Sequence, residues 1–432
     1  MSYNPEPNTH QPQASDEQQA TPTTRPPRKT IRNIGINVLL SLFSLVVSLV
    51  VAEYGFQLYQ YGTIISGAHA KRWNATIQPD TTLGWSKKPN SVDYLFREEY
   101  YQEIRINSLG LRDHEYAYAK PDGVFRVLIL GDSFVEAIEV SLQQTFAKEL
   151  ERILNEAGRI GKKVEVINGG TRGYDTVQEL RFLETEGLKY KPDLVVLAFC
   201  PNDLPDPARI SGQNVTPSTR ATSPPAPVKN AGESSPVRGS AKRWLRENSA
   251  LYRYIRSRVK YGFPALAGSL QKFGLIKAGQ EPDLVNSDIQ RFYGESSPAD
   301  RDYLSGLFSN LKNLAHTHHF IPVVFTTPLR EQVYPKDWEM SCALYKINPA
   351  EYDLDRLKNM VSELCNDLGL QFVDMLTVFR KEAASRRLHF HFDGHWNANG
   401  HAAVAQELGR VLLTETNSPL AQVAEQTGIR SH

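Results

Sequence analysis

Cysteine and net charge are both scarce in this chain of 432 residues. With 49 Lys and Arg against 48 Asp and Glu, the formal net charge is only +1. Such a balance gives no indication of a nucleic-acid-binding surface. The three cysteines, Cys200, Cys342 and Cys365, lack the close spacing of a metal-binding motif, and an odd number leaves at least one thiol free. A disulfide framework is therefore excluded, and a single Cys342–Cys365 bridge stays open.

Large apolar side chains are nearly absent from residues 1–33, which are rich in Pro, Gln, Thr and Asn. Such a segment cannot bury enough apolar surface to offset the entropy lost on ordering. We therefore expect a disordered N-terminal tail. The same reasoning predicts a frayed tail over residues 414–432.

The longest apolar run, Ile34–Ala52, predicts a membrane anchor over residues 34–54. About 19 helical residues span about 29 Å, close to the thickness of the hydrocarbon core. A buried core helix or a cleaved signal peptide are the alternatives, and the long leading segment favours an uncleaved anchor. Four basic residues precede the run: Arg25, Arg28, Lys29 and Arg32. The positive-inside rule then predicts an inner-membrane protein with a cytoplasmic N-terminus and a periplasmic main domain.

Strand and helix patterns alternate over residues 125–413. The predicted strands are Phe125–Leu130, Val164–Asn168, Leu194–Phe199, Ile321–Thr326 and Gln371–Asp374. The predicted helices are Thr145–Ala157, Thr176–Leu188, Ala299–Ala315, Leu354–Leu368 and Asn399–Leu413. Alternation of this kind is typical of an α/β fold with three layers, in which helices cover both faces of a parallel sheet.

Two further regions interrupt or precede this alternation. Residues 62–124 carry short strand and turn patterns and are expected to form an N-terminal addition packed on the main domain. An insert over about residues 205–290 begins with a flexible Pro- and Ser-rich part. It continues in Trp244–Phe273 as a basic amphipathic helix. That helix either packs on the domain with a solvated charged face or contacts the anionic membrane surface.

Polar residues follow the predicted strands at the points where these end. Ser133 comes directly after the first strand in Gly-Asp-Ser, and Gly173 lies in the glycine-rich loop after the second. Asn202 follows the third strand, and Asp393 and His395 lie in the last loop before the final helix. Because parallel strands end at one edge of a sheet, these residues can converge there. Acyl transfer needs a nucleophile, a base, an orienting acid and oxyanion donors, and each role has a candidate.

These blocks, in this order, resemble the SGNH (GDSL) hydrolase family, in its membrane-anchored bacterial form. The resemblance implies a flavodoxin-like SGNH fold, with Ser133 as nucleophile, His395 as base and Asp393 as its orienting acid. It also implies that Gly173 and Asn202 hold the oxyanion or the substrate, and that no cofactor is needed. The last block is Asp-Gly-His-Trp, similar to periplasmic SGNH-like proteins that O-acetylate alginate. Asp132 is expected to bond backbone N–H groups in its own turn.

The resemblance implies a serine-dependent acyl ester hydrolase that acts outside the cytoplasm on acylated envelope polysaccharide or exopolysaccharide. One alternative is a polysaccharide O-acetyltransferase that uses the same residues. Another is a non-catalytic component of an envelope polysaccharide machine. A zinc set of His389, His391, Asp393 and His395 is a further alternative, but it leaves the serine constellation unexplained, so no metal is expected. The catalytic histidine is expected to be neutral at rest, with a pKa near 6–7.

Overall fold

The computed structural model describes residues 28–65, 75–204, 244–245, 248–262, 289–295 and 298–414. The chain divides into two units, residues 1–53 and 54–432. Helix α1 (Arg28–Tyr61) contains one stretch, Ile36–Tyr61, that is long and apolar enough to cross a membrane. Its most apolar window has a mean hydropathy of 2.2, and none of that window is buried. The predicted tail over residues 1–33 lies outside the described residues up to 27, and α1 already begins at Arg28.

The main domain is built on a five-stranded parallel sheet with the strand order β6-β5-β7-β8-β9. The strands are β5 (Val124–Leu130), β6 (Lys163–Asn168), β7 (Leu194–Phe199), β8 (Ile321–Thr326) and β9 (Gln371–Val373). The predicted α/β class and the five predicted strands are confirmed, with bounds that differ by one residue at most. The strand order changes direction between β5 and β7, and open α/β sheets bind ligands at the strand ends beside such a point.

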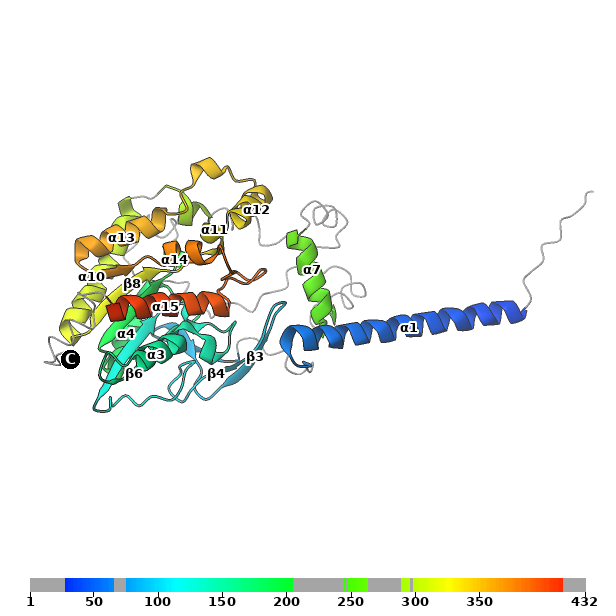
Figure 1. Ribbon diagram of the computed structural model, residues 1–432, viewed down its shortest axis with the longest axis horizontal. Coiled ribbons are helices and arrows are strands. Elements are labelled where there is room, and N and C mark those ends of the chain that lie inside the picture. Colours follow the sequence, from blue (N-terminus) through cyan, green and yellow to red (C-terminus); the bar gives the residue numbers. More distant parts are fainter. Residues whose placement is uncertain are drawn as a thin grey trace, which may run out of the picture. The chain divides into compact units, whose positions relative to one another are not determined.

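Helices cover both faces of the sheet (Figure 1). On one face lie α3 (Phe146–Ala157), α14 (Met375–Glu382) and α15 (Ala398–Thr414), and on the other α4 (Thr176–Thr185), α10 (Pro298–His318) and α13 (Arg356–Leu368). Along β5, Val127 and Ile129 pack toward the first set, while Leu128 and Leu130 pack toward the second. This alternation explains why β5 is wholly apolar apart from Arg126.

The predicted helices form with small shifts at their ends. Thr145 is the N-cap of α3 and not its first residue, because its hydroxyl accepts the Lys148 N–H. The helix predicted over Thr176–Leu188 ends at Thr185 and continues as a 3₁₀ turn over Gly187–Tyr190. Short helices that the pattern did not indicate are α2 (Ser133–Glu136), α11 (Arg330–Val333) and α12 (Pro335–Tyr345). All three cysteines are buried and free, so Cys342 and Cys365 do not pair.

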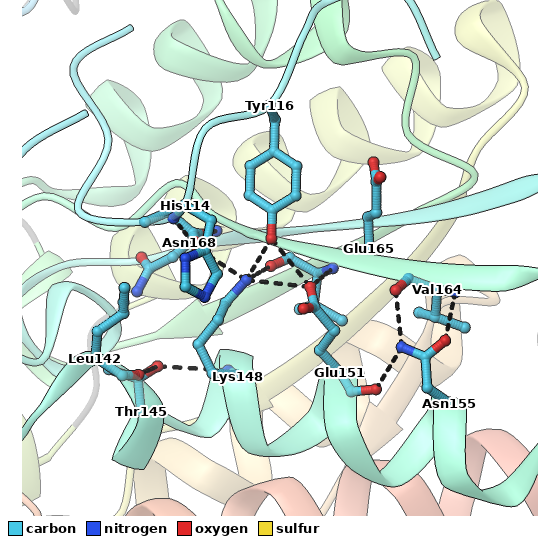
Figure 2. A network of polar contacts seen from close by, with 12 residues as sticks. His114, Tyr116, Leu142, Thr145, Lys148, Glu151, Asn155, Val164, Glu165 and Asn168 are labelled. Carbon is cyan, nitrogen blue, oxygen red and sulfur yellow. Dashed lines mark hydrogen bonds and ion pairs between the residues drawn. The ribbon is translucent and has the colours of Figure 1, made fainter. Parts of the chain in front are cut away.

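The N-terminal addition forms two antiparallel hairpins, β1 (Ile77–Asp80) with β2 (Gly84–Lys87) and β3 (Val92–Phe96) with β4 (Tyr101–Arg105). A buried lysine, Lys148 of α3, holds the chain that follows them. Its ammonium bonds the Tyr116 hydroxyl at 2.6 Å and pairs with Asp113 at 2.8 Å and Glu151 at 3.1 Å. Figure 2 shows the Lys148 side chain pointing at Tyr116 and Glu151. A charged network of this kind fixes this part of the addition on α3 of the main domain.

Helix α7 (Ala250–Gly262) lies in the insert. Its Arg253 guanidinium lies 3.5 Å from the centre of the Phe96 ring, on strand β3. Its Tyr254 ring lies 5.9 Å from the ring of Phe392, the residue before Asp393. These contacts favour the packed-helix interpretation of the basic segment. The predicted flexible part, residues 211–240, and the predicted tail beyond residue 414 lie outside the described residues.

Candidate active site

Ser133 lies at the start of α2, in the tight turn where β5 ends. Glycine is required at position 131, because a Cβ there would lie 2.2 Å from a methyl of Val135. Asp132 is the N-cap of α2, and its Oδ1 accepts the Phe134 N–H at 2.9 Å. The local hydrogen bonding expected for Asp132 is therefore present, and the turn presents a half-buried Ser133 side chain.

Ser133, His395 and Asp393 form one chain of hydrogen bonds, although Ser133 and His395 are 262 residues apart. Nε2 of His395 lies 2.8 Å from the Ser133 hydroxyl, and Nδ1 lies 2.5 Å from Oδ1 of Asp393. The same carboxylate oxygen accepts the backbone N–H of His395 at 3.0 Å. The Phe134 ring packs against the imidazole, with 4.9 Å between centroids. The arrangement has the connectivity of a serine nucleophile, a base and an orienting acid.

The loop that carries Asp393 and His395 is held by the β3–β4 hairpin. The carboxylate of Glu99 accepts backbone N–H groups of His391 and Phe392, each at 2.7 Å. The Tyr100 hydroxyl donates to Oδ2 of Asp393 at 2.6 Å. Each oxygen of Asp393 therefore has a donor. Sequence reasoning assigned no role to Glu99 or Tyr100, and their local sequence carries no signal for one.

Charges around His395 shift the pKa values of the site. Burial disfavours the charged imidazole, but the carboxylates of Glu139 and Asp393 outweigh it and raise the pKa of His395 to about 10. Burial also works against the Asp393 carboxylate, yet the imidazole and the hydrogen bonds from His395 and Tyr100 hold its pKa well below the usual range. The expectation of a histidine pKa near 6–7 is therefore wrong, because it counted one carboxylate where the structure has two.

Asn202 and Gly173 are placed less tightly than the other three residues. Asn202 is exposed in a 3₁₀ turn after β7, and its side-chain amide donates to Oδ2 of Asp132 at 2.9 Å. Asp132 thereby connects the Ser133 turn to the Asn202 turn. Gly173 lies in an exposed turn after β6, with a φ of 76° that favours glycine. The hydrogen bonds of the described residues do not connect Gly173 to the other four.

The zinc set weighed from the sequence is not assembled in the described part of the chain. His389 is fully buried, its Nε2 lies 3.0 Å from the Pro328 carbonyl oxygen, and burial lowers its pKa to about 3. His391 is exposed. Among described residues, the acidic and histidine ligand atoms close enough to share an ion are those of Glu139, Asp393 and His395. That group shares only two members with the weighed set, and its histidine is already bonded to Ser133.

A hollow of about 380 Å³ opens beside the site, on the Nδ1 side of His395. Its walls include Glu99, Tyr100, Glu139, Phe390 and Asn397. Neither Ser133 nor His395 lines it.

Comparison with known protein families finds a similarity in the C-terminal part of the chain. A family model described as the SGNH hydrolase-like domain of the acetyltransferase AlgX matches residues 309–431. The matched part contains Asp393 and His395 but neither Ser133 nor Asn202. No curated protein sequence matches the chain.

Several solved esterase structures resemble this chain weakly. An acetyl xylan esterase named AlAXEase is 13% identical, covering 66% of this chain and 98% of its own, with a TM-score of 0.36. An acetylxylan esterase from Geobacillus stearothermophilus is 12% identical (66% and 93% covered, TM-score 0.34), and a lipase/acylhydrolase from Enterococcus faecalis is 14% identical (66% and 94%, TM-score 0.33). Scores this low carry no argument about activity. Over residues 309–431 the chain is similar to the SGNH hydrolase-like domain of the acetyltransferase AlgX.

Proposed function

We propose that the protein is a serine-dependent acyl-transfer enzyme that cleaves acyl esters on envelope polysaccharide or exopolysaccharide outside the cytoplasm. The observation that carries the proposal is the continuous hydrogen-bond chain from Asp393 through His395 to the Ser133 hydroxyl. The three side chains come from two regions that are far apart in the sequence, and a purely structural polar cluster has no need of this order of partners.

In the first step, which uses the neutral form of His395, Oγ of Ser133 attacks the ester carbonyl carbon while Nε2 of His395 takes the hydroxyl proton. The tetrahedral intermediate collapses, the leaving alcohol receives that proton from His395, and the acyl group stays on Ser133. Asp393 holds the Nδ1–H of His395 and stabilises the imidazolium. An acceptor hydroxyl then loses its proton to His395, attacks the acyl-serine and carries the acyl group away, which restores Ser133.

The oxyanion of each tetrahedral intermediate needs donors close to Ser133. We assign this role to the backbone N–H groups of Ser133 and Gly173 and to the side-chain amide of Asn202. Among the described residues, no hydrogen-bond acceptor occupies either of these backbone N–H groups. Of the two N–H bonds of the Asn202 amide, one is bonded to Asp132, which orients the other. Loss of one such donor typically costs about 3–4 kcal/mol of transition-state stabilisation.

The molecule that accepts the acyl group decides between two activities of the same site. Water as acceptor gives an esterase, and a sugar hydroxyl gives an O-acetyltransferase, which the match to the AlgX family model favours as the second candidate. The anchoring helix α1 would hold the domain at the inner membrane, with the N-terminus in the cytoplasm. An active periplasmic reporter fused after His432, with an inactive cytoplasmic one, is the result expected for that orientation.

The experiment uses the full chain in detergent with an acetyl ester donor, with and without an oligosaccharide acceptor. Released acetate and acetylated oligosaccharide are measured separately, in wild type and in Ser133→Ala. An esterase releases acetate in both conditions, and a transferase acetylates the oligosaccharide. A Ser133→Ala protein that retains full activity would contradict the proposal.

A further inference from the structure

Glu139 is a second buried carboxylate beside His395, and the mechanism above gives it no role. It lies in the segment after α2 and is only 4% exposed. Its Oε1 is 3.6 Å from Nδ1 of His395, the same nitrogen that bonds Asp393. Its Oε2 is buried and has no hydrogen-bond partner among the described residues. A buried carboxylate with a missing partner is costly, so its position calls for a compensating role.

The backbone that carries Glu139 is held rigidly. Arg112, itself 2% exposed, donates to the carbonyl oxygens of Glu136, Ala137 and Val140 at 2.6–2.9 Å. Ala137 adopts the left-handed conformation, with a φ of 55°, which ends α2 and redirects the chain. The guanidinium of Arg112 therefore donates to backbone carbonyls around Glu139 and not to its carboxylate. That carboxylate is directed at His395.

We propose that Glu139 is a positioning residue that acts with Asp393 on the Nδ1 side of His395, so that two carboxylates stabilise the imidazolium formed when Ser133 loses its proton. The inference rests on the proposed role of His395 as general base. Asp393 sets the tautomer through a direct hydrogen bond, whereas Glu139 acts through its charge at a slightly longer distance. Because Glu139 is buried, water screens its charge little, so the charge has a strong effect at this distance.

Other titratable groups surround this pair from several elements. They are Asp132 before α2, Arg112 of the lead-in to β5, Tyr100 and Glu99 of the β3–β4 hairpin, His389 before the last block and His401 of α15. Burial lowers the pKa of both His389 and His401 to about 3, so neither is charged near neutral pH. Asp132 adds negative charge from the Ser133 side, and Arg112 partly offsets Glu139. Glu139 can be neutralised without breaking a hydrogen bond to His395 or to Ser133.

The test is the titration of His395 in the full chain in detergent, followed by NMR of histidines labelled with ¹³C at the Cε1 position. The resonance is assigned by its loss in His395→Ala, and no substrate is needed. In Glu139→Gln we expect the titration midpoint of His395 to fall by at least one pH unit. Glu139→Asp keeps the charge at a greater distance and should give a midpoint between the two. An unchanged midpoint in both variants would overturn the inference.

Labelling of Ser133 by a fluorophosphonate gives a second readout. The pH profile of the labelling rate should move to lower pH in Glu139→Gln, with a lower plateau, because a weaker base is neutral earlier but accepts a proton less readily. The matched control is Glu165→Gln on β6, which removes a carboxylate paired with Arg126 at 2.9 Å. It should lower thermal stability and leave the pH profile unchanged, which is the result that a merely structural role predicts for Glu139.

The two proposals fail in different ways. If wild type shows no dependence on Ser133, the proposed function fails, and the NMR midpoint of His395 can still be measured. If activity depends on Ser133 and the midpoint does not respond to Glu139, only the present inference fails.

Discussion

Glu136 and Glu139 are both buried, three residues apart in the segment that follows Ser133, yet their surroundings are opposite. The carboxylate of Glu136 is clamped by Arg172, whose Nη2 lies 2.8 Å from Oε1, and it also accepts the Arg172 backbone N–H at 2.6 Å. Burial opposes its charge, but Arg172 and Lys87 lower its pKa. Among the described residues Glu139 has no lysine or arginine at ion-pair distance, and burial raises its pKa to about 7. The paired carboxylate stabilises the fold, and the poorly paired one faces the reacting histidine.

The difference between the two glutamates shows where the molecule keeps a buried carboxylate that is poorly paired. Natural folds satisfy buried charges unless a site requires otherwise. Glu136 ties the turn after β6 to the Ser133 segment through Arg172, so it acts on geometry. Glu139 contributes little to cohesion and changes the charge at His395. The following predictions separate cohesion from chemistry, from the largest expected effect to the smallest.

The largest effect is expected from removal of the proposed nucleophile or the proposed base, which tests whether these residues carry the acyl transfer. Ser133→Ala and His395→Ala should each reduce acyl transfer by on the order of 10⁴-fold or more. Both proteins should melt cooperatively, Ser133→Ala near the wild-type temperature and His395→Ala at a lower one, because the second change removes the partner of the Asp393 carboxylate. Steady-state assays and calorimetry on the full chain measure the two effects. Retained activity in both variants would remove the proposed roles of Ser133 and His395.

Asp393→Asn should lower kcat by about 10²–10⁴-fold, less than loss of Ser133, because the site remains assembled with the wrong histidine tautomer. The stability of the variant should also depend less on pH in the acid range. The depressed pKa of Asp393 stabilises the fold above its unfolded pKa of about 4, and this contribution is lost as the pH falls below that value. Thermal melts from pH 3 to pH 7 should therefore show a flatter acid limb in the variant. An equally steep limb would show that Asp393 is not paired in solution.

Breaking the Glu136–Arg172 pair tests whether Glu136 stabilises the fold. Arg172→Met should destabilise the fold by about 3–5 kcal/mol, because it leaves a buried carboxylate uncompensated. The double variant Arg172→Met with Glu136→Leu should lose less than the sum of the two single changes. Urea unfolding of the three variants gives the coupling energy. Strict additivity would mean that the two side chains do not act as a pair.

Glu139→Gln is expected to change the stability of the fold in the opposite direction. The pKa of Glu139 is raised from its ordinary value to about 7, so its contribution to stability is present below about pH 4.5 and is lost as the pH rises toward 7. Glutamine does not titrate, so the variant should become more stable relative to wild type across that window, by on the order of 1–3 kcal/mol. Melting temperatures at pH 5 and pH 8 measure the change. A variant that is less stable by the same amount at both pH values would assign Glu139 to the fold.

The smallest effect is expected at Tyr100. Tyr100→Phe removes one neutral donor from Asp393 and should lower kcat by about 5–20-fold, equivalent to about 1–2 kcal/mol. The ring still packs 4.8 Å from the Phe390 ring, so stability should change little. The matched control is Tyr94→Phe on the neighbouring strand, since Tyr94 stacks on Tyr101. That variant should keep full activity.

The sequence by itself determined the layers of the fold and the order of the blocks. Apolar runs such as β5 and β7 are readable because a strand buried on both faces must be apolar along its whole length. The Asp132 turn is readable because capping is local, within two or three residues. Asp393 and His395 are readable as a pair because they are two residues apart. The acidic positions 136 and 139, inside an otherwise apolar stretch, carried a signal of buried charge that the resemblance did not use.

Only the tertiary structure decided which distant groups reach these local features. Tyr100 meets Asp393 across 293 residues of sequence, and Lys148 of α3 pairs with Asp113 at 2.8 Å. Such contacts leave no period or spacing in the chain, because they depend on how separately formed elements pack. The pKa of His395 is of the same kind. It depends on the number of carboxylates that packing brings to Nδ1, and the sequence motif contains only one of the two.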